Sequence, residues 1–266
     1  MKLCFSTLGC PDRSLEDILS LANEYHAEAI EIRGIGGTLN NTEIEAFFSE
    51  NQARTHQLFR EKNVRPILLG TSCRFHLSDK FEDAIAEGIS AIRIARAFDI
   101  PYIRVFGDRI LSDGQACIDR VISGLQRLCR QDADVSVLLE VHGDFNTVGA
   151  LSPVLESMKN IKNFGLIWDI EHTHQSYGDN WSSFYRFARP YIKHVHIKDY
   201  SNTKKSLTLI GEGDVPIAPI VSRLNGDGYD GYLSLEWEKK WHPELDNIEL
   251  ALKSFISLIE KTEKRS

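Results

Sequence analysis

Four residues able to bind a metal ion each follow directly after a short apolar stretch. They are Glu140 after 135–139, Asp169 after 164–168, His196 after 192–195 and Glu236 after 232–235. Each stretch has the length and composition of a buried strand. Carboxylates and imidazoles are ligands of divalent cations. The spacing therefore predicts four strands that each present a potential ligand at the C-terminal end.

Three carboxylates and one imidazole suit a single divalent ion of intermediate hardness, such as Mn²⁺, Mg²⁺ or Co²⁺, and Zn²⁺ is also compatible. No cysteine lies near these four positions to add a thiolate. The alternative is that each residue merely ends its strand and faces water. Because the pattern recurs on four successive strands, it favours one shared metal site over four solvated strand ends.

Further polar residues lie close to these ligands in the sequence. His142 and His172 follow Glu140 and Asp169 by two and three positions, so we expect them to bind substrate or orient a ligand; the alternative is that they cap the next helix. Lys198 shares its strand side with His196 and could bind a substrate oxygen or lie at the surface. His194 is expected on the opposite side, towards the helices.

Two charged residues on earlier strands are further candidates for substrate binding. Glu31 ends the second predicted strand, where it could bind substrate or pair with Arg33 or Arg104. Arg104 lies within the fourth predicted strand, and a buried arginine requires an acidic partner. Glu31 and Glu140 are the expected partners. Weaker candidates for the mouth of the site are Arg74, His76 and an aromatic wall at Trp237.

The segments that position these residues alternate between strand and helix patterns. Strands are expected at 2–7, 29–32, 64–69, 102–106, 135–139, 164–168, 192–195 and 232–235. Helices are expected from 14, at 42–62, from 79, and at 114–130, 148–158, 181–188, 217–224 and 247–261, with a longer loop at 201–214. Ser14 and Asp17 resemble a capping box, and Gly211-Glu212-Gly213 could close over a site.

Eight strand-helix units favour an α/β fold with a parallel sheet covered by helices. Their number and the chain length match a (β/α)₈ TIM barrel, here a single domain at 1–266. A doubly wound sheet is the alternative, but no Gly-x-Gly-x-x-Gly follows the first strand. In a barrel all strand C-termini lie on one face, which would gather the four potential ligands into one cluster.

The composition restricts the partners and the compartment. The net charge of −7 argues against a nucleic-acid partner. Five scattered cysteines without a Cys-x-x-Cys pair indicate a reduced, cytoplasmic setting. The N-terminal residues enter a strand directly, without a signal-peptide pattern. No apolar run approaches the roughly 20 residues needed to cross a membrane, so no membrane association is expected.

Five motifs together resemble a known superfamily. They are Leu139-Glu140-Val141-His142, Trp168-Asp169-Ile170-Glu171-His172, Val195-His196-Ile197-Lys198-Asp199, Gly211-Glu212-Gly213-Asp214 and Ser234-Leu235-Glu236-Trp237-Glu238. The chain is similar over its whole length to the xylose isomerase-like barrels of sugar phosphate isomerases and epimerases. That superfamily also includes ketose 3-epimerases, inosose dehydratase, 3-dehydroshikimate dehydratase and endonuclease IV.

The resemblance implies a metal-dependent isomerase or epimerase of a small sugar or sugar derivative. One divalent ion, Mn²⁺ favoured, would be held by Glu140, Asp169, His196 and Glu236. Glu140 and Glu236 would act as acid and base, removing a proton alpha to a metal-bound carbonyl and returning one to the other face of an enediolate. His172 would contact the substrate. Many relatives are dimers or tetramers, so a homo-oligomer is compatible.

Two departures argue against a tagatose or psicose epimerase: residues 199–204 contain no arginine, and Asn146 stands where those enzymes have a glutamate. The main alternative is a lyase or dehydratase acting on a keto-inositol or a related keto acid, since both reactions share the first proton abstraction. An endonuclease IV-like activity is disfavoured, because residues 205–210 lack the required Asp-x-His pair. A non-catalytic sugar-binding barrel is the last alternative.

Overall fold

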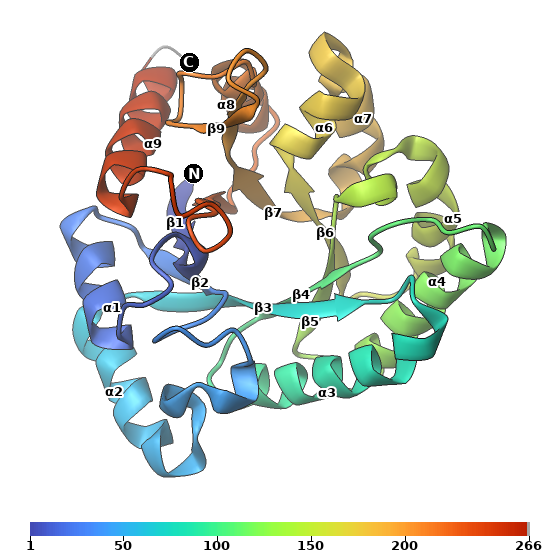
Figure 1. The fold of residues 1–266 in the computed structure, drawn as a ribbon, viewed down its shortest axis with the longest axis horizontal. Helices are drawn as coiled ribbons and strands as arrows, with labels where there is room; N and C mark the ends of the chain where they lie inside the picture. The colour runs from blue at the N-terminus through green and yellow to red at the C-terminus, as the bar shows by residue number, and fades with distance from the viewer. Residues whose placement is uncertain (265–266) are drawn as a thin grey trace.

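Eight parallel strands close into a barrel in the computed structural model, which describes residues 1–264 (Figure 1). The barrel strands are β1 (Lys2–Ser6), β2 (Ala29–Ile32), β3 (Arg65–Arg74), β4 (Tyr102–Phe106), β5 (Ser136–Glu140), β6 (Phe164–Asp169), β7 (Ile192–Ile197) and β10 (Tyr232–Leu235). Their order around the barrel follows the chain, and β10 pairs with β1. The predicted (β/α)₈ architecture is confirmed. The last two residues of the predicted domain, 265 and 266, lie outside the described residues.

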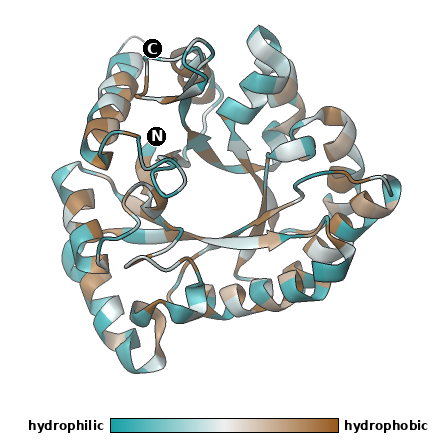
Figure 2. Cartoon of the chain, in the orientation of Figure 1, coloured by the Kyte–Doolittle hydropathy of each residue, from teal (hydrophilic) through white to brown (hydrophobic). Residues whose placement is uncertain are grey.

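Helices surround the barrel on its outside (Figure 1). They are α1 (Leu15–Glu24), α2 (Gln52–Lys62), α3 (Phe81–Ala97), α4 (Gln115–Cys129), α5 (Val148–Met158), α6 (Ile170–Tyr177), α7 (Trp181–Ala188), α8 (Ile217–Gly226) and α9 (Ile248–Glu263). The strands contain many hydrophobic residues, and the helices carry both hydrophobic and hydrophilic residues (Figure 2). The predicted cap of α1 is present, with Ser14 Oγ accepting from Asp17 N at 3.2 Å. Within residues 1–264 no helix is long and apolar enough to cross a membrane.

The prediction of a helix at 42–62 is wrong for the first half of this segment. Three short 3₁₀ turns, Asn41–Glu43, Glu45–Phe47 and Ser49–Asn51, precede α2. Ile44 and Phe48 separate these turns with extended backbone, which interrupts the hydrogen-bond pattern of an α-helix. This irregular path buries the side chains of Ile44 and Phe47 in the core, although the segment reads as polar overall.

Two other elements differ from the sequence prediction. The predicted loop at 201–214 is partly an antiparallel hairpin, formed by β8 (Asp199–Ser201) and β9 (Ser206–Thr208). Helix α6 was not predicted at all, and it begins directly after β6. The N-cap of α6 is Asp169, a carboxylate at a position that commonly starts a helix, so the capping signal was present in the sequence.

The inside of the barrel changes from apolar to polar along the strands. A separate apolar cluster fills the barrel interior and is formed by Cys4, Ala29, Ile67, Leu68, Leu138 and Ile167. Because side chains of a strand alternate between its two sides, the residues two and four positions further lie on the same side. On β5 this row continues from Leu138 to Glu140 and His142, which line a cavity. The barrel thus positions its polar residues at the C-terminal ends of the strands.

The cysteines provide a test of the packing. All five are free and buried, and burial raises the pKa of Cys10 and of Cys129 to about 12. Since the thiolate is the reactive form, we expect a thiol reagent at pH 8 to leave the folded protein largely unmodified and to label all five cysteines after unfolding. Mass spectrometry of both samples checks this. Rapid labelling of a folded-state thiol would contradict the close packing.

Candidate functional site

The four predicted ligands converge at the C-terminal end of the barrel. Ligand atoms of Glu140, Asp169, His196 and Glu236 all lie within 4.8 Å of one another, and all four residues are buried. Glu140 Oε2, Asp169 Oδ2 and His196 Nδ1 make no regular hydrogen bond, and they contact only oppositely charged side chains of the site. Their convergence fits a divalent cation bound by three carboxylates and one imidazole.

The carboxylate of Asp169 is held in place by the start of α6. Its Oδ1 atom accepts from Glu171 N at 2.9 Å and from His172 N at 3.1 Å. Its Oδ2 atom remains available to the site. One oxygen therefore caps the helix while the other can bind a cation, and the backbone of α6 sets the direction of the carboxylate.

Glu31 orients the imidazole of His196 from below the site. Glu31 Oε2 lies 3.0 Å from His196 Nε2, and Glu31 Oε1 lies 2.8 Å from His194 Nε2. The partners of Glu31 are thus two histidines instead of Arg33 or Arg104. With Nε2 engaged by the carboxylate, His196 directs Nδ1 towards Glu140 Oε1 and Glu236 Oε2, at 3.6 and 3.4 Å. A carboxylate that fixes a ligand histidine in this way is typical of metal centres.

The prediction that His194 faces the helices is wrong. Its side chain is fully buried and shares the carboxylate of Glu31 with His196. The physical reason is the strand period itself: residues two apart in a strand project to the same side, so His194 and His196 both point into the barrel. The same rule correctly placed Lys198 beside His196.

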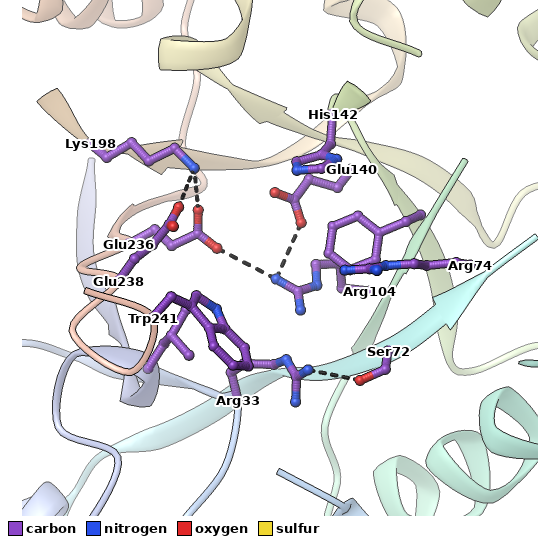
Figure 3. Close-up of a pocket in the computed structure, with 12 residues that line it drawn as sticks. Arg33, Ser72, Arg74, Arg104, Glu140, His142, Lys198, Glu236, Glu238 and Trp241 are labelled. Atoms are coloured by element: carbon purple, nitrogen blue, oxygen red, sulfur yellow. Dashed lines mark hydrogen bonds and ion pairs between the residues drawn. The ribbon is translucent and has the colours of Figure 1, made fainter. Parts of the chain in front are cut away.

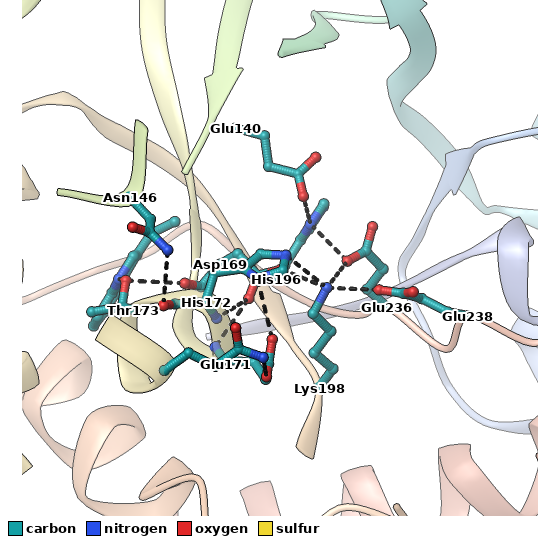
Figure 4. Close-up of polar contacts among 12 residues, drawn as sticks. Glu140, Asn146, Asp169, Glu171, His172, Thr173, His196, Lys198, Glu236 and Glu238 are labelled. Atoms are coloured by element: carbon teal, nitrogen blue, oxygen red, sulfur yellow. Dashed lines mark hydrogen bonds and ion pairs between the residues drawn. The ribbon is translucent and has the colours of Figure 1, made fainter. Parts of the chain in front are cut away.

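Two buried cations, Arg104 and Lys198, neutralise the carboxylates. Figure 4 shows Lys198 directed towards Glu236 and Glu238. Arg104 Nη1 lies 3.2 Å from Glu140 Oε2 and 3.4 Å from Glu236 Oε1, so Glu140 is one of its acidic partners as expected. Lys198 Nζ lies 2.9 Å from Asp169 Oδ2, 3.0 Å from Glu236 Oε2 and 2.7 Å from Glu238 Oε1. Lys198 is therefore not a surface lysine, and it holds three acidic side chains at the edge of the site.

These charges set the ionisation of the two central glutamates. Burial favours the neutral acid in both. In Glu236 the positive charges of His196 and Lys198 outweigh burial and hold its pKa well below the usual value. In Glu140 burial and the charge of Glu236 raise the pKa, but Arg104 and His196 outweigh them and lower it. Both side chains are therefore ionised at neutral pH, the form that binds a cation or accepts a proton.

A cavity of about 360 Å³ lies above this group (Figure 3). Its walls are formed by Leu8, Arg33, Ser72, Arg74, Arg104, Phe106, Glu140, His142, Lys198, Glu236, Glu238 and Trp241. Trp237 is buried and donates from Nε1 to Asp246 O, so it belongs to the core and is not an aromatic wall. The half-exposed Trp241, in the loop after β10, takes that place. The volume suits a small molecule of the size of a sugar.

The two histidines predicted beside the ligands lie next to each other. The ring centroids of His142 and His172 are 4.6 Å apart. His172 Nδ1 lies 3.3 Å from Glu171 Oε2, and its Nε2 lies 3.4 Å from Lys198 Nζ. Burial lowers the pKa of His172 despite the nearby charge of Asp169. His172 is therefore a neutral imidazole that can exchange a hydrogen bond with a substrate oxygen.

Sequence reasoning did not single out Glu171, Glu238, Arg33 or Trp241 as parts of the site. For Glu238 the signal was available, because it follows Glu236 by two positions and lies on the same side. A local signal was also available for Glu171, which directly precedes His172 and contacts it, whereas Arg33 and Trp241 reach the cavity wall only through the fold. Arg74 lies in the cavity wall as expected, whereas His76 is buried beside Asp108, with 3.8 Å between Nδ1 and Oδ2.

The glycine-containing loop is anchored to the barrel by Asp199. Asp199 Oδ2 accepts from Gly211 N at 2.8 Å and from Gly213 N at 3.0 Å, and Oδ1 accepts from Val215 N at 3.2 Å. A Cβ atom at position 213 would lie 2.2 Å from Asp199 Oδ1, which explains the glycine. The loop is therefore fixed at the edge of the barrel by these hydrogen bonds.

We expect Asp199→Ala to destabilise the protein markedly, because several backbone donors lose their shared acceptor. Each buried donor left unpaired costs about 1–3 kcal/mol. Urea unfolding measures the difference. Asp214→Ala in the same loop is the control, since it removes one exposed contact with Asn202 N and should cost less than about 1 kcal/mol. Equal stability of both variants would show that Asp199 does not anchor the loop.

Comparison with known proteins identifies the family. The sequence model of the xylose isomerase-like TIM barrel family matches residues 19–258. The chain belongs to the xylose isomerase-like TIM barrel family. An uncharacterized protein of Methanocaldococcus jannaschii is 30% identical over 113 residues, which span 40% of this chain and 38% of that relative.

Solved structures share the fold of this xylose isomerase-like barrel. The probable 3-DHS dehydratase AsbF of Bacillus anthracis is 20% identical with a TM-score of 0.79, over 97% of this chain and 98% of the other. The IolI protein with a bound zinc atom is 18% identical with a TM-score of 0.77, over 98% and 99%. A D-tagatose 3-epimerase-like protein is 22% identical with a TM-score of 0.75, over 100% and 99%.

Proposed function

We propose that this xylose isomerase-like barrel is a divalent-metal-dependent isomerase or epimerase of a small sugar or sugar derivative. The observation that carries the proposal is the convergence of Glu140, Asp169, His196 and Glu236, four buried residues whose possible ligand atoms all lie within 4.8 Å of one another. The cavity above them has the size of a small molecule. The net charge of −7 disfavours a nucleic-acid substrate.

A divalent ion held by these four residues would polarise a substrate carbonyl and the neighbouring hydroxyl. Glu140 and Glu236 lie on β5 and just after β10, which β6 and β7 separate in the barrel. They therefore approach a bound substrate from two directions. One ionised glutamate would take the proton alpha to the carbonyl and become the neutral acid. The other glutamate, after taking up a proton from solvent, would give that proton to the opposite face of the resulting enediolate.

The remaining polar residues bind and orient the substrate. Lys198 and the neutral His172 lie side by side and can both bond a hydroxyl or carbonyl oxygen. Arg104 holds Glu140 and Glu236 at a fixed separation through Nη1. The ring of His142 packs against His172 and Phe106 and so limits the movement of both. We infer that these residues position substrate oxygens beside the two glutamates.

A dehydratase or lyase is the second candidate, and one observation favours it. Next to the central glutamates lies a further group of proton-bearing side chains, Glu171, His172 and Lys198. An acid in this group could protonate a β-hydroxyl as it leaves, after the same proton abstraction. An epimerase needs only the two opposed glutamates.

Incubation of metal-loaded protein with panels of ketoses, keto-inositols and keto acids in D₂O separates the two reactions. An epimerase or isomerase incorporates deuterium at the exchanged carbon, and apart from this deuterium the product has the same mass as the substrate. A dehydratase produces an enone with loss of water. Water loss without any epimer would reject the isomerase proposal in favour of the second candidate. Absence of turnover together with tight sugar binding would instead indicate a binding protein.

A further inference from the structure

Within the described residues 1–264, Arg33 is a buried cation without an acidic partner. Its residue is 7% exposed, and it lies in the wall of the cavity. Its guanidinium donates from Nη1 to Leu39 O at 3.2 Å and from Nη2 to Ser72 Oγ at 2.8 Å, and both acceptors are neutral. Among residues 1–264, no carboxylate lies within ion-pair distance of Arg33. A buried charge is costly unless a counter-charge accompanies it.

The fold makes specific room for this arginine. A Cβ atom at Gly70 on β3 would lie 2.7 Å from Arg33 Cδ and 3.4 Å from Arg104 Nη2. Only a glycine at this position lets the stem of Arg33 cross β3 next to Arg104. Asn41 Nδ2 donates to Gly70 O at 2.9 Å and supports the same stretch of backbone. The side chain of Arg33 is therefore held in a built position and not at a flexible edge.

The other three cations of the cavity wall are each paired with a carboxylate. Arg104 and Lys198 are matched by Glu140, Glu236 and Glu238 in the same cavity wall. That leaves Arg33 and Arg74, of which Arg74 binds Asp108 Oδ2 through Nε at 3.2 Å and is otherwise half-exposed. Burial and the charges of Arg104 and Arg74 lower the pKa of Arg33 to about 10, although Glu87 partly opposes them.

Figure 3 shows how these groups are arranged in the cavity. Lys198 and His142 lie on one side, Arg33 and Ser72 lie on the other, and Arg104 lies between them beside the central glutamates. A molecule whose reacting carbons lie at Glu140 and Glu236 can therefore extend towards Arg33. A guanidinium has five N–H donors in a planar fork that matches carboxylate and phosphate oxygens.

We propose that the substrate carries an oxyanion group, a carboxylate or a phosphate, which binds to Arg33 with the help of Ser72 and Arg74. The inference rests on the proposed function, because the anion is part of the molecule that reacts at the metal centre. It narrows the substrate class from neutral sugars to sugar acids or sugar phosphates. The oxyanion supplies the counter-charge that Arg33 lacks in the described part of the chain.

The experiment titrates metal-loaded protein with inorganic phosphate, D-glycerate and the neutral glycerol, by calorimetry and by thermal unfolding. We expect phosphate or D-glycerate to bind and to raise the Tm, and glycerol to do neither. Arg33→Met should weaken anion binding at least about tenfold, and Arg74→Met by a smaller factor. Arg93→Met, on the exposed side of α3, is the matched control and should leave binding unchanged.

Anion binding directly to the metal would survive Arg33→Met, so an unchanged affinity in that variant would overturn the inference. If Arg33→Met does not fold, Arg33→Lys and Arg74→Met provide the same test, since lysine keeps the charge but loses the planar fork. The anion that binds more tightly identifies the substrate class. Tighter binding of phosphate indicates a sugar phosphate, and tighter binding of D-glycerate indicates a sugar acid.

Failure of this inference can be told apart from failure of the proposed function. Turnover of neutral sugars that neither anion inhibits would overturn the anion site and leave the metal-dependent isomerase intact. Anion binding that depends on Arg33, in a protein that holds no metal and turns over no sugar, would support the anion site and reject the isomerase.

Discussion

Glu236→Gln should remove the bound divalent ion and lower turnover by about 10²–10⁴-fold, the usual contribution of a positioned acid or base. The substitution keeps the size of the side chain but replaces an ionised ligand by a neutral amide. It also removes the charge that Lys198 and Arg104 contact. Metal content per chain after gentle purification, together with Mn²⁺ titration, measures the first effect.

Glu238→Gln is the matched control for this prediction. Glu238 also contacts Lys198 and lines the same cavity, but it does not belong to the four-residue ligand group. It should retain the ion. If wild-type protein holds no ion even after addition of Mn²⁺, the central hypothesis fails, and the four side chains are only a polar layer at the end of the barrel.

Glu31→Ala should destabilise the protein by about 3–5 kcal/mol, the cost of leaving a buried charged partner uncompensated. Glu31 is the shared hydrogen-bond partner of His194 and His196, and all three residues are buried. Burial would raise the pKa of Glu31, but the two histidines outweigh it and hold the pKa far below its usual value. Urea unfolding measures the loss of stability.

The milder Glu31→Gln should lower metal affinity about 10–100-fold, because the amide no longer fixes the ring of His196 as the carboxylate does. Glu28→Ala, an exposed residue just before β2, is the control and should change stability by less than about 0.5 kcal/mol. An unchanged Mn²⁺ affinity in Glu31→Gln would mean that packing alone orients His196, and Glu31 would then have no positioning role.

The proposed substrate class links the proposed metal centre to Arg33. Arg104 lies between the central glutamates and Gly70, where its guanidinium contacts Glu140 and approaches the stem of Arg33. A substrate that spans this distance would be oriented at both ends, at its reacting carbons and at its anionic group. Orientation of this kind lowers the entropic barrier of the reaction.

The amino-acid sequence alone determined the barrel and the common location of the four candidate ligands. Alternating apolar strands and amphipathic helices predict a closed parallel sheet, and such a barrel brings every strand end to one face. Glu140, Asp169, His196 and Glu236 could therefore be predicted as neighbours, because each follows its own strand by local pattern. The period of two placed Lys198, and correctly applied it would also have placed His194 and Glu238.

Only the tertiary structure decided which residues pair across the barrel. Glu31 lies 163 and 165 positions from the two histidines that it orients, and Arg33 reaches the cavity because Gly70 leaves space on another strand. Trp241 lines the cavity while Trp237 packs in the core, although both follow β10 closely. These outcomes depend on side-chain volumes and charges that meet only after folding, so no local pattern in the sequence contains them.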